Sequence, residues 1–194
     1  MSASVWYEEV DKGLLEELQN TIKIPNVKGD LVPLDRECFI VRKPEEDFKI
    51  ETYPSVSIYN LDSTFDPMRY DPNQVVINKN YEDNYSVVED PSVPFNLTYQ
   101  IDFWAQYQED MNTMIKTWLE KHFRQFNLKV IDEGGTERTC NCFKKGNIVK
   151  SDLVQNGERL FHSIISYTIW VELDSETSYN ISMVSTTNIK TKFE

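Results

Sequence analysis

Two long stretches of the chain alternate between apolar and polar residues, which is the pattern of a β-strand with one buried face. They cover residues 93–107 and 158–174. The second face of each stretch is mainly polar and carries one tryptophan, Trp104 in the first and Trp170 in the second. The pattern predicts two long strands whose polar faces are either solvated or covered by a neighbouring subunit.

The spacing of apolar residues changes to that of an α-helix at two places. One stripe has Glu109 and Asp110 at its start and Lys121 near its end, which suits the helix dipole. The stripe consists of Met111, Met114, Ile115, Trp118, Leu119, either His122 or Phe123, and Phe126. A smaller helix is predicted near the N-terminus, capped by Asp11 and ended by Pro25.

The remaining pattern indicates short strands and turns. Residues 38–43 and 53–65 are expected as strands, and Gly134-Gly135 predicts a β-hairpin. Residues 66–94 contain three Asp-Pro pairs but also tyrosines and valines, which favours an ordered excursion such as a hairpin. We predict one α+β domain over residues 1–174: a mainly antiparallel sheet, one long helix packed on a face and a smaller N-terminal helix. Residues 175–194 are expected to form a C-terminal arm.

The charge of the chain narrows the choice of partners. Lys and Arg number 20 against 32 Asp and Glu, which gives a net charge of −12. Such a surface repels duplex DNA and an acidic membrane, so we expect neither sequence-specific nucleic-acid binding nor membrane binding. No run approaches the ~20 apolar residues of a membrane span, and the first residues do not have the pattern of a signal peptide.

The sequence offers few residues in arrangements that could catalyse a reaction. The two histidines lack ligand partners at metal spacing, and Cys140 and Cys142 lack a second pair, so we expect no metal and no cofactor. Adjacent carboxylates occur at residues 45–47 and 109–110, where acids are ordinarily solvated rather than placed across a substrate. The sequence predicts a protein that is not an enzyme. A hydrolase or a carbohydrate-binding module on the same sheet is the alternative of another class.

Aromatic residues supply the candidates for a protein–protein interface, because tryptophan and tyrosine are favoured at such contacts. The expected subunit-interface residues are Trp6, Tyr7, Trp104, Gln106, Trp170, Tyr179 and Phe193. For the tryptophans of the long strands, the alternative is burial beneath a loop of the same chain. For the C-terminal arm, the alternatives are addition of a strand to a partner's sheet and fraying.

Three stretches together resemble a pattern of the neck and tail-completion proteins of tailed bacteriophages. They are YPSVSIYNLDSTFDPMRY, VPFNLTYQIDFWAQYQEDMNTMIKTWL and ERLFHSIISYTIWVELD. In that pattern a long strand ending in Y-Q-I-D-x-W leads into a helix with D-M-N, and a strand ending in E-L follows. The resemblance covers residues 53–126 and 158–174, and the two terminal segments do not take part in it.

The resemblance implies a tail terminator-like fold and a hexameric ring at the head-proximal end of a virion tail, assembled in the host cytoplasm. The implied partners are tail tube and sheath proteins, which the ring caps, and head–tail connector proteins, which dock on it. A closed ring needs heterologous interfaces, and an acidic chain permits passage of the genome through its lumen. The alternatives are a head–tail adaptor, a baseplate component and an assembly factor absent from the particle.

Overall fold

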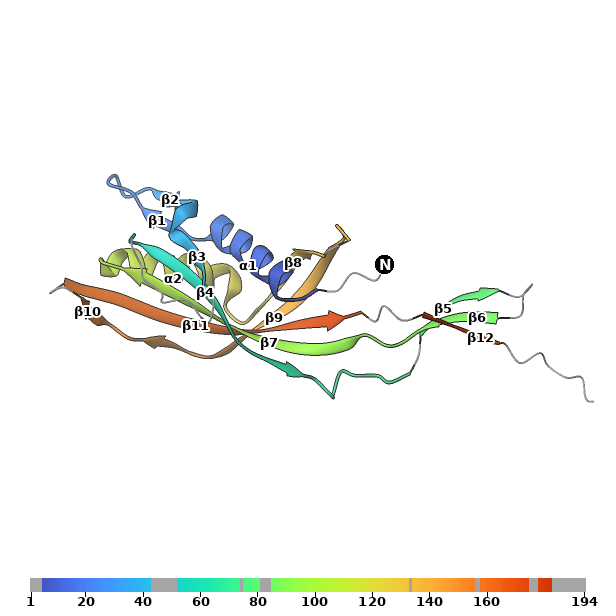
Figure 1. Ribbon diagram of the computed structural model, residues 1–194. Coiled ribbons are helices and arrows are strands. Elements are labelled where there is room, and N and C mark those ends of the chain that lie inside the picture. Colours follow the sequence, from blue (N-terminus) through green and yellow to red (C-terminus); the bar gives the residue numbers. More distant parts are fainter. Residues whose placement is uncertain are drawn as a thin grey trace, which may run out of the picture.

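The structure has a body and an arm (Figure 1). It is a computed structural model that describes residues 5–42, 52–73, 75–80, 85–132, 134–155, 158–174 and 178–182. In the body a curled sheet carries two helices on one face, and in the arm a smaller sheet projects from one end of the body. The predicted α+β fold with a mainly antiparallel sheet is confirmed.

Seven strands of the described chain form the main sheet. Its order is β3 (Phe39–Val41), β4 (Ser55–Phe65), β7 (Val93–Ala105), β11 (Glu158–Leu173), β9 (Glu137–Lys150) and β8 (Gln125–Ile131), while β10 (Leu153–Gln155) pairs with one end of β11. β3 and β4 run parallel, and the other pairs are antiparallel. The two stretches with the clearest alternation, β7 and β11, are neighbours near the centre of the sheet.

The helices α1 (Tyr7–Thr21) and α2 (Gln108–His122) cover the same face of the main sheet (Figure 1). Each has 15 residues, so the expectation of one long and one smaller helix is wrong. α1 contacts β3 and β4 on one side of the sheet and β8 at the opposite edge, because the sheet curls around it. α1 approaches β8 closely at Gly13, where a Cβ atom would lie 2.7 Å from the Lys129 carbonyl oxygen.

The start of α1 differs from the prediction. The helix begins at Tyr7 rather than after Asp11, because the Glu9 carboxylate accepts a hydrogen bond from the backbone N–H of Trp6 at 3.1 Å. Asp11 instead accepts a hydrogen bond from the hydroxyl of Tyr99 at 2.7 Å and thereby ties α1 to the sheet.

The ends of both helices also differ from the prediction. α1 ends at Thr21, and Pro25, which was expected to end it, lies in β1 (Lys23–Pro25), the first strand of a hairpin with β2 (Leu31–Pro33). α2 ends at His122, so Phe126 lies on β8 and not on the helix. Its ring still packs against Trp118 of α2, with ring centroids 5.6 Å apart. The apolar stripe of the sequence therefore continues in space although the helix does not.

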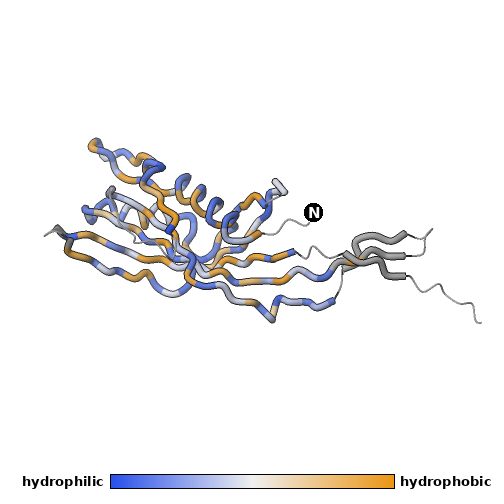
Figure 2. Tube along the Cα trace, in the orientation of Figure 1, coloured by the Kyte–Doolittle hydropathy of each residue, from blue (hydrophilic) through white to orange (hydrophobic). Residues whose placement is uncertain are grey.

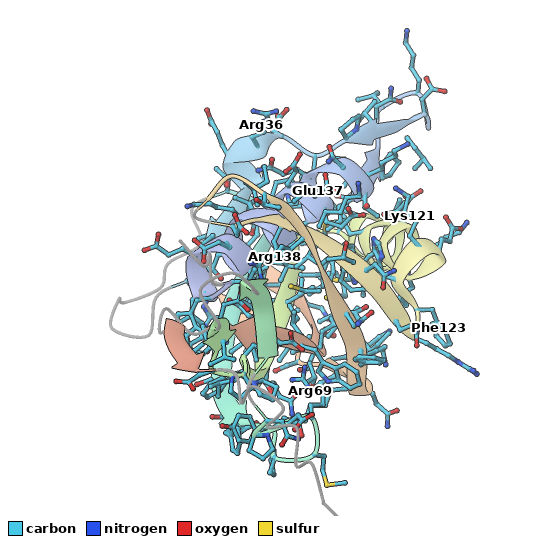
Figure 3. The ribbon with its side chains drawn as sticks, turned by 90° about the vertical axis from the view of Figure 1, so that its right-hand side faces the viewer. Arg36, Arg69, Lys121, Phe123, Glu137 and Arg138 are labelled. Carbon is cyan, nitrogen blue, oxygen red and sulfur yellow. The ribbon has the colours of Figure 1, made fainter. Side chains whose placement is uncertain are left out.

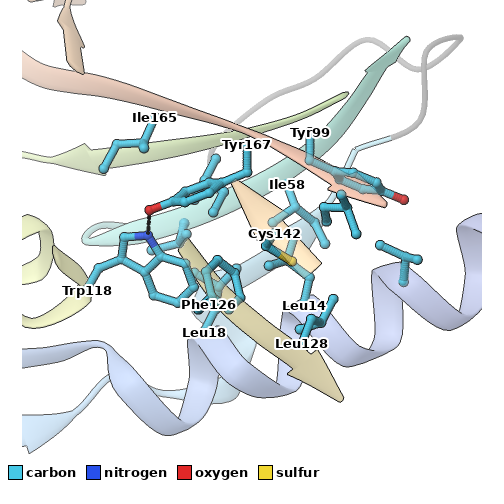
Figure 4. Close-up of a cluster of buried hydrophobic side chains, with 14 of the residues drawn as sticks. Leu14, Leu18, Ile58, Tyr99, Trp118, Phe126, Leu128, Cys142, Ile165 and Tyr167 are labelled. Carbon is cyan, nitrogen blue, oxygen red and sulfur yellow. Dashed lines mark hydrogen bonds between the residues drawn. The ribbon is translucent and has the colours of Figure 1, made fainter. Parts of the chain in front are cut away.

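The hydrophobic core lies between the two helices and the main sheet. Hydropathy alternates along β7 and β11 (Figure 2), and the apolar members of this alternation face the helices. The indole N–H of Trp118 donates to the hydroxyl of Tyr167 at 2.9 Å (Figure 4). This hydroxyl donates to the His122 carbonyl oxygen at 2.7 Å. These three buried polar groups thus satisfy one another and connect α2 to β11.

The arm continues the two central strands of the body. Its sheet has the order β12 (Ser178–Ser182), β6 (Tyr85–Glu89) and β5 (Val75–Asn80). β6 leads into β7, and β12 follows β11, so both strands pass from the body into the arm (Figure 1). The β5–β6 pair is the hairpin expected in the loop-rich region. β12 lies within residues 175–194, the segment predicted from the sequence as a C-terminal arm, and it pairs with β6 of its own chain.

Candidate assembly surface

The face of the main sheet that is turned away from α1 and α2 is called the outer face here (Figure 1). It carries the polar rows of the two central strands: Asn96, Thr98, Gln100, Asp102 and Trp104 on β7, and His162, Ile164, Ser166, Thr168 and Trp170 on β11. The register places Trp104 opposite His162 and Trp170 opposite Asn96. The two tryptophans singled out in the sequence therefore share one face but lie at opposite ends of it.

At one end of the outer face, three side chains converge on the carboxylate of Asp102. Oδ2 accepts a hydrogen bond from Arg42 Nη1 at 2.7 Å, and Oδ1 accepts one from Gln100 Nε2 at 2.8 Å. Nε2 of His162 lies 2.9 Å from Oδ1. The imidazole of His162 stacks on the indole of Trp104, with planes 6° apart. Because Asp102 is fully buried, the Arg42 guanidinium is needed to compensate its charge.

This cluster joins residues from three strand regions that are distant in the sequence. Arg42 directly follows β3, Asp102 lies on β7, and His162 lies on β11. A carboxylate that is closed to solvent and engaged by three partners leaves no position for a substrate, so the cluster fixes the strand register rather than serving as a catalytic base. Trp104 is part of it and is only 9% exposed, which matches the alternative of burial within its own chain.

At the other end of the outer face, Trp170 remains partly accessible, with 37% of the residue exposed. The Arg69 guanidinium carbon lies 4.8 Å from the centroid of its ring, and the ring of Phe143 on β9 lies 4.4 Å away. Arg69 is held in place by Asp66 at 2.9 Å and by the carbonyl oxygen of Phe95 at 2.8 Å. Trp170 is thus oriented by its own chain and still presents area to a partner.

Trp6 and Tyr7 lie at the start of α1, on the opposite face of the sheet from Trp170. Their rings are 4.4 Å apart, and Trp6 meets Phe95 edge-on at 5.2 Å. The aromatic row continues through Phe65 to Tyr70, and these two residues are 45% and 37% exposed. Trp6 and Tyr7 are therefore anchored on the body, and the exposed part of the row lies beside them.

The other three expected interface residues fall elsewhere. Gln106 is exposed just beyond the end of β7. Tyr179 lies on β12, where its backbone is opposite Val88 of β6. Phe193 lies outside the described residues. The expected interface residues that the structure places are consequently spread over both faces of the body and the arm, and they do not form one continuous patch.

Groups with metal-binding or nucleophilic character are dispersed over the described residues. Within them, no three His, Cys, Asp or Glu side chains gather as a metal site would require. His122 is buried between the helices with Nε2 3.0 Å from Glu17, and burial lowers its pKa more than the Glu17 charge raises it. Cys140 is a free, buried thiol, and burial raises its pKa to about 11, which keeps it protonated and unreactive.

Of the two groups of adjacent carboxylates, the described one, Glu109 and Asp110, does not face a second carboxylate across a cleft. Glu109 is exposed in the first turn of α2, and the pKa of Asp110 is raised by burial and then by the Glu109 charge. A shallow cleft at this turn is lined by Gln108, Glu109, Asn112, Thr113 and Lys116, so it holds one carboxylate and not two. Residues 45–47 lie outside the described residues.

The cluster around Asp102 is the part of this surface that the sequence pattern does not reveal. Asp102 belongs to the polar row of its strand, beside Gln100, and the alternation gives no sign that this carboxylate is buried. A buried carboxylate needs partners in the fold. The partners themselves are not readable, because Arg42 and His162 reach it only through the strand order.

Comparisons with known proteins assign no family to the chain. No protein-family model matches it, and no curated protein matches it in sequence. Among the described residues, neither helix is long and apolar enough to cross a lipid bilayer.

Proposed function

We propose that the protein is a structural subunit of a bacteriophage tail, a tail terminator or tail-completion protein. Six subunits close into a ring at the head-proximal end of the tail. The ring caps the tail tube and sheath and presents a docking face to the head–tail connector. Its function is binding, without catalysis.

The arm is the observation that carries this proposal. β7 and β11 lead past the helices into a separate sheet that covers neither the helices nor the main sheet (Figure 1). Its outer strands β5 and β12 each have one edge without a partner strand in the described chain. Free strand edges on a projection are suited to pairing with another polypeptide. Such a projecting element would let a ring subunit reach its neighbour.

The placement of the resembling stretches supports the same proposal. They correspond to β4, to β7 with α2, and to β11. β4, β7 and β11 are adjacent in the main sheet, and α2 contacts both β7 and β11. The resemblance therefore covers one continuous unit of the structure, with the strands and the helix in mutual contact, rather than scattered segments.

A ring also needs two different contact patches on each subunit, since its interfaces are heterologous. The partly exposed Trp170 on the outer face and the free strand edges of the arm provide two such patches. The net charge of −12 supports a lumen that does not retain nucleic acid.

Light scattering and negative-stain electron microscopy of the full chain test the ring. We expect closed rings with a mass of six chains, formed alone or on purified tails. The protein should then be added to polymerising tail tube protein, where a terminator stops elongation and is seen at one tube end. An adaptor would bind the connector instead, and a baseplate component would bind the opposite end. A strict monomer that leaves tube growth unchanged would disprove the proposal.

A further inference from the structure

The main sheet opens between β9 and β11. Their pairing ends at Trp170 and Asn141. Beyond this pair, β9 continues with β8 alone, and β11 continues with β7 alone. A cavity of about 350 Å³ lies in the opening and is called the slot here. It is lined by residues 138–141 of β9, by residues 170–172 of β11, and by Val5 and Arg69.

Both walls of the slot are strand edges. Backbone N–H and C=O groups alternate between the two sides of a strand, so residues 138–140 and 171–173 direct some of theirs into the slot. No strand of the described chain pairs with these edges. At the wide end, Arg138 Nη2 reaches Asp174 Oδ2 at 2.7 Å. A strand added between the two edges needs roughly 10 Å, twice the ~4.8 Å spacing of paired strands. An ion pair between an extended arginine and an aspartate can bridge a gap of that order.

The slot combines an apolar floor with an excess of negative charge. Val5, which is 2% exposed, closes it on the helix side. Arg69 and Arg138 face the end of the body from which the arm leaves (Figure 3). Both are already paired with carboxylates, Arg69 with Asp66, and Arg138 with Asp132 and Asp174. Glu172 on the slot wall adds a further negative charge, so carboxylates outnumber arginines around the slot.

We propose that the slot receives residues 189–193 (IKTKF) of a second copy of this chain as an added strand. The second copy is the neighbour in the ring, so this inference rests on the homo-oligomeric part of the proposed function. The strand would pair with the free edges of β9 and β11 and close the main sheet across the subunit boundary.

The chemistry of this segment fits the slot. Its residues favour strands, and Ile189, Thr191 and Phe193 alternate with Lys190 and Lys192. The segment carries two lysines and no acid in a chain with a net charge of −12. The apolar row matches the Val5 floor, and the lysines match the excess of carboxylates around the opening.

The direction of β12 identifies a second copy as the donor. β12 runs away from the body, because Ser178 pairs with Glu89 and Ser182 pairs with Tyr85. Val171 on the slot wall is paired with Phe95 of β7, so Phe95 marks how far along the sheet the slot lies. Phe95 follows Tyr85, the partner of Ser182, by ten residues along β6 and β7. That separation is about 30 Å, whereas the six residues 183–188 span at most ~20 Å. Residue 189 therefore cannot reach the level of the slot, and residues 189–193 cannot all lie in the slot of their own chain.

Disulfide trapping on the full chain tests the inference. Thr139 is exposed on the slot wall, so Thr139→Cys is combined with Thr191→Cys and oxidised mildly. We expect chain-to-chain disulfides that form at least about tenfold faster than in a control, because docking raises the local thiol concentration. The control combines Thr191→Cys with Lys28→Cys in the exposed β1–β2 turn. Thr191→Cys alone measures the reaction with the natural cysteines.

The outcomes separate this inference from the ring itself. Trapping at the control rate, or a disulfide that closes within one chain, would overturn the strand proposal. Rings that form with trapping at the control rate would overturn it and leave the ring intact. Trapped dimers without rings would support the strand and contradict the ring. A free peptide of residues 183–194 should slow trapping in the full chain, and a peptide of the same composition in scrambled order should not.

Discussion

Trp104 and His162 stack face to face across the β7–β11 pair, with ring centroids 3.6 Å apart. This buried contact distinguishes Trp104 from Trp170, which shares the outer face but is 37% exposed. Trp104→Ala should lower the free energy of unfolding by about 3–5 kcal/mol, as for other buried tryptophans. Trp170→Ala should lower it by about 1 kcal/mol, since the ring loses an arginine contact and little buried area.

The two tryptophan variants should also differ in assembly. Trp170→Ala should weaken ring formation while its urea transition stays near that of the natural protein. Trp104→Ala should shift the urea transition, and any assembly defect should follow its lost stability. Circular dichroism in urea and light scattering on the same samples give both quantities. Equal destabilisation by the two changes would contradict the placement of Trp104 in the core of the cluster.

Asp102→Asn should destabilise the protein by about 3 kcal/mol, because it leaves the Arg42 guanidinium without its buried counter-charge. Asp62→Asn on the neighbouring strand β4 is the matched control, since Asp62 is exposed and accepts a hydrogen bond from the backbone N–H of Ser63. Asp62→Asn should change the free energy of unfolding by no more than about 0.5 kcal/mol. Similar urea midpoints for the two variants would show that the Asp102 cluster does not hold the sheet.

Gly13→Ala should destabilise the protein by about 1–3 kcal/mol although alanine favours helices. The new Cβ would lie 2.7 Å from the Lys129 carbonyl oxygen and 2.9 Å from Cγ1 of Val130, so α1 would have to move away from β8. Asn20→Ala, on the exposed side of the same helix, should leave the melting temperature unchanged or raise it slightly. A Gly13→Ala protein that melts at or above the natural temperature would rule out this close approach.

His122 should make the protein less stable in mild acid. Burial lowers its pKa below the ordinary 6.5, so the unfolded chain binds a proton more readily than the folded protein does. The His122 contribution is therefore constant above about pH 7, and stability is lost as the pH falls below 6.5 and through the lowered folded pKa. His122→Gln removes this titration.

Urea unfolding of both proteins between pH 7.5 and pH 5, in about half-unit steps, measures the effect. The difference between the natural protein and His122→Gln cancels the shared carboxylate titrations. We expect the natural protein to lose more free energy of unfolding than His122→Gln as the pH falls. A difference that is flat, or that favours the natural protein in acid, would contradict a lowered pKa.

The two long strands could be predicted from the sequence, because their apolar residues recur at every second position and this is the face that the structure buries. The stretch predicted as 93–107 is β7, Val93–Ala105, and the stretch predicted as 158–174 is β11, Glu158–Leu173. The helix ends were not readable for local reasons. Trp6 precedes α1 without a capping side chain, and Glu9 supplies the hydrogen bond from within the helix. No glycine or proline separates α2 from β8, so Phe126 continued the helical spacing.

The candidate surface was readable only in part. The sequence singled out Trp104 and Trp170 by their polar neighbours, but their different burial depends on side chains from other strands. The Asp102 cluster joins residues 60 positions apart in both directions, Arg42 and His162. The slot exists because the pairing of β9 with β11 ends at Asn141 and Trp170, and the residue types at these positions do not predict where the pairing ends. Both features follow from strand order, which no local pattern specifies.

The continuity of β7 and β11 with the arm has a mechanical consequence. Thirteen residue pairs, from Phe161–Ala105 to Leu173–Val93, join the two strands inside the body. Both strands leave the body at the same end, so a pull on the arm moves them together and loads the hydrogen bonds to their outer neighbours, β4 and β9. These bonds lie across the strands, so an axial pull loads many of them at the same time. A tensile load is then shared along the whole strand pair, whereas a sideways pull would open the bonds one after another. The arm is therefore attached to the body in its direction of greatest strength.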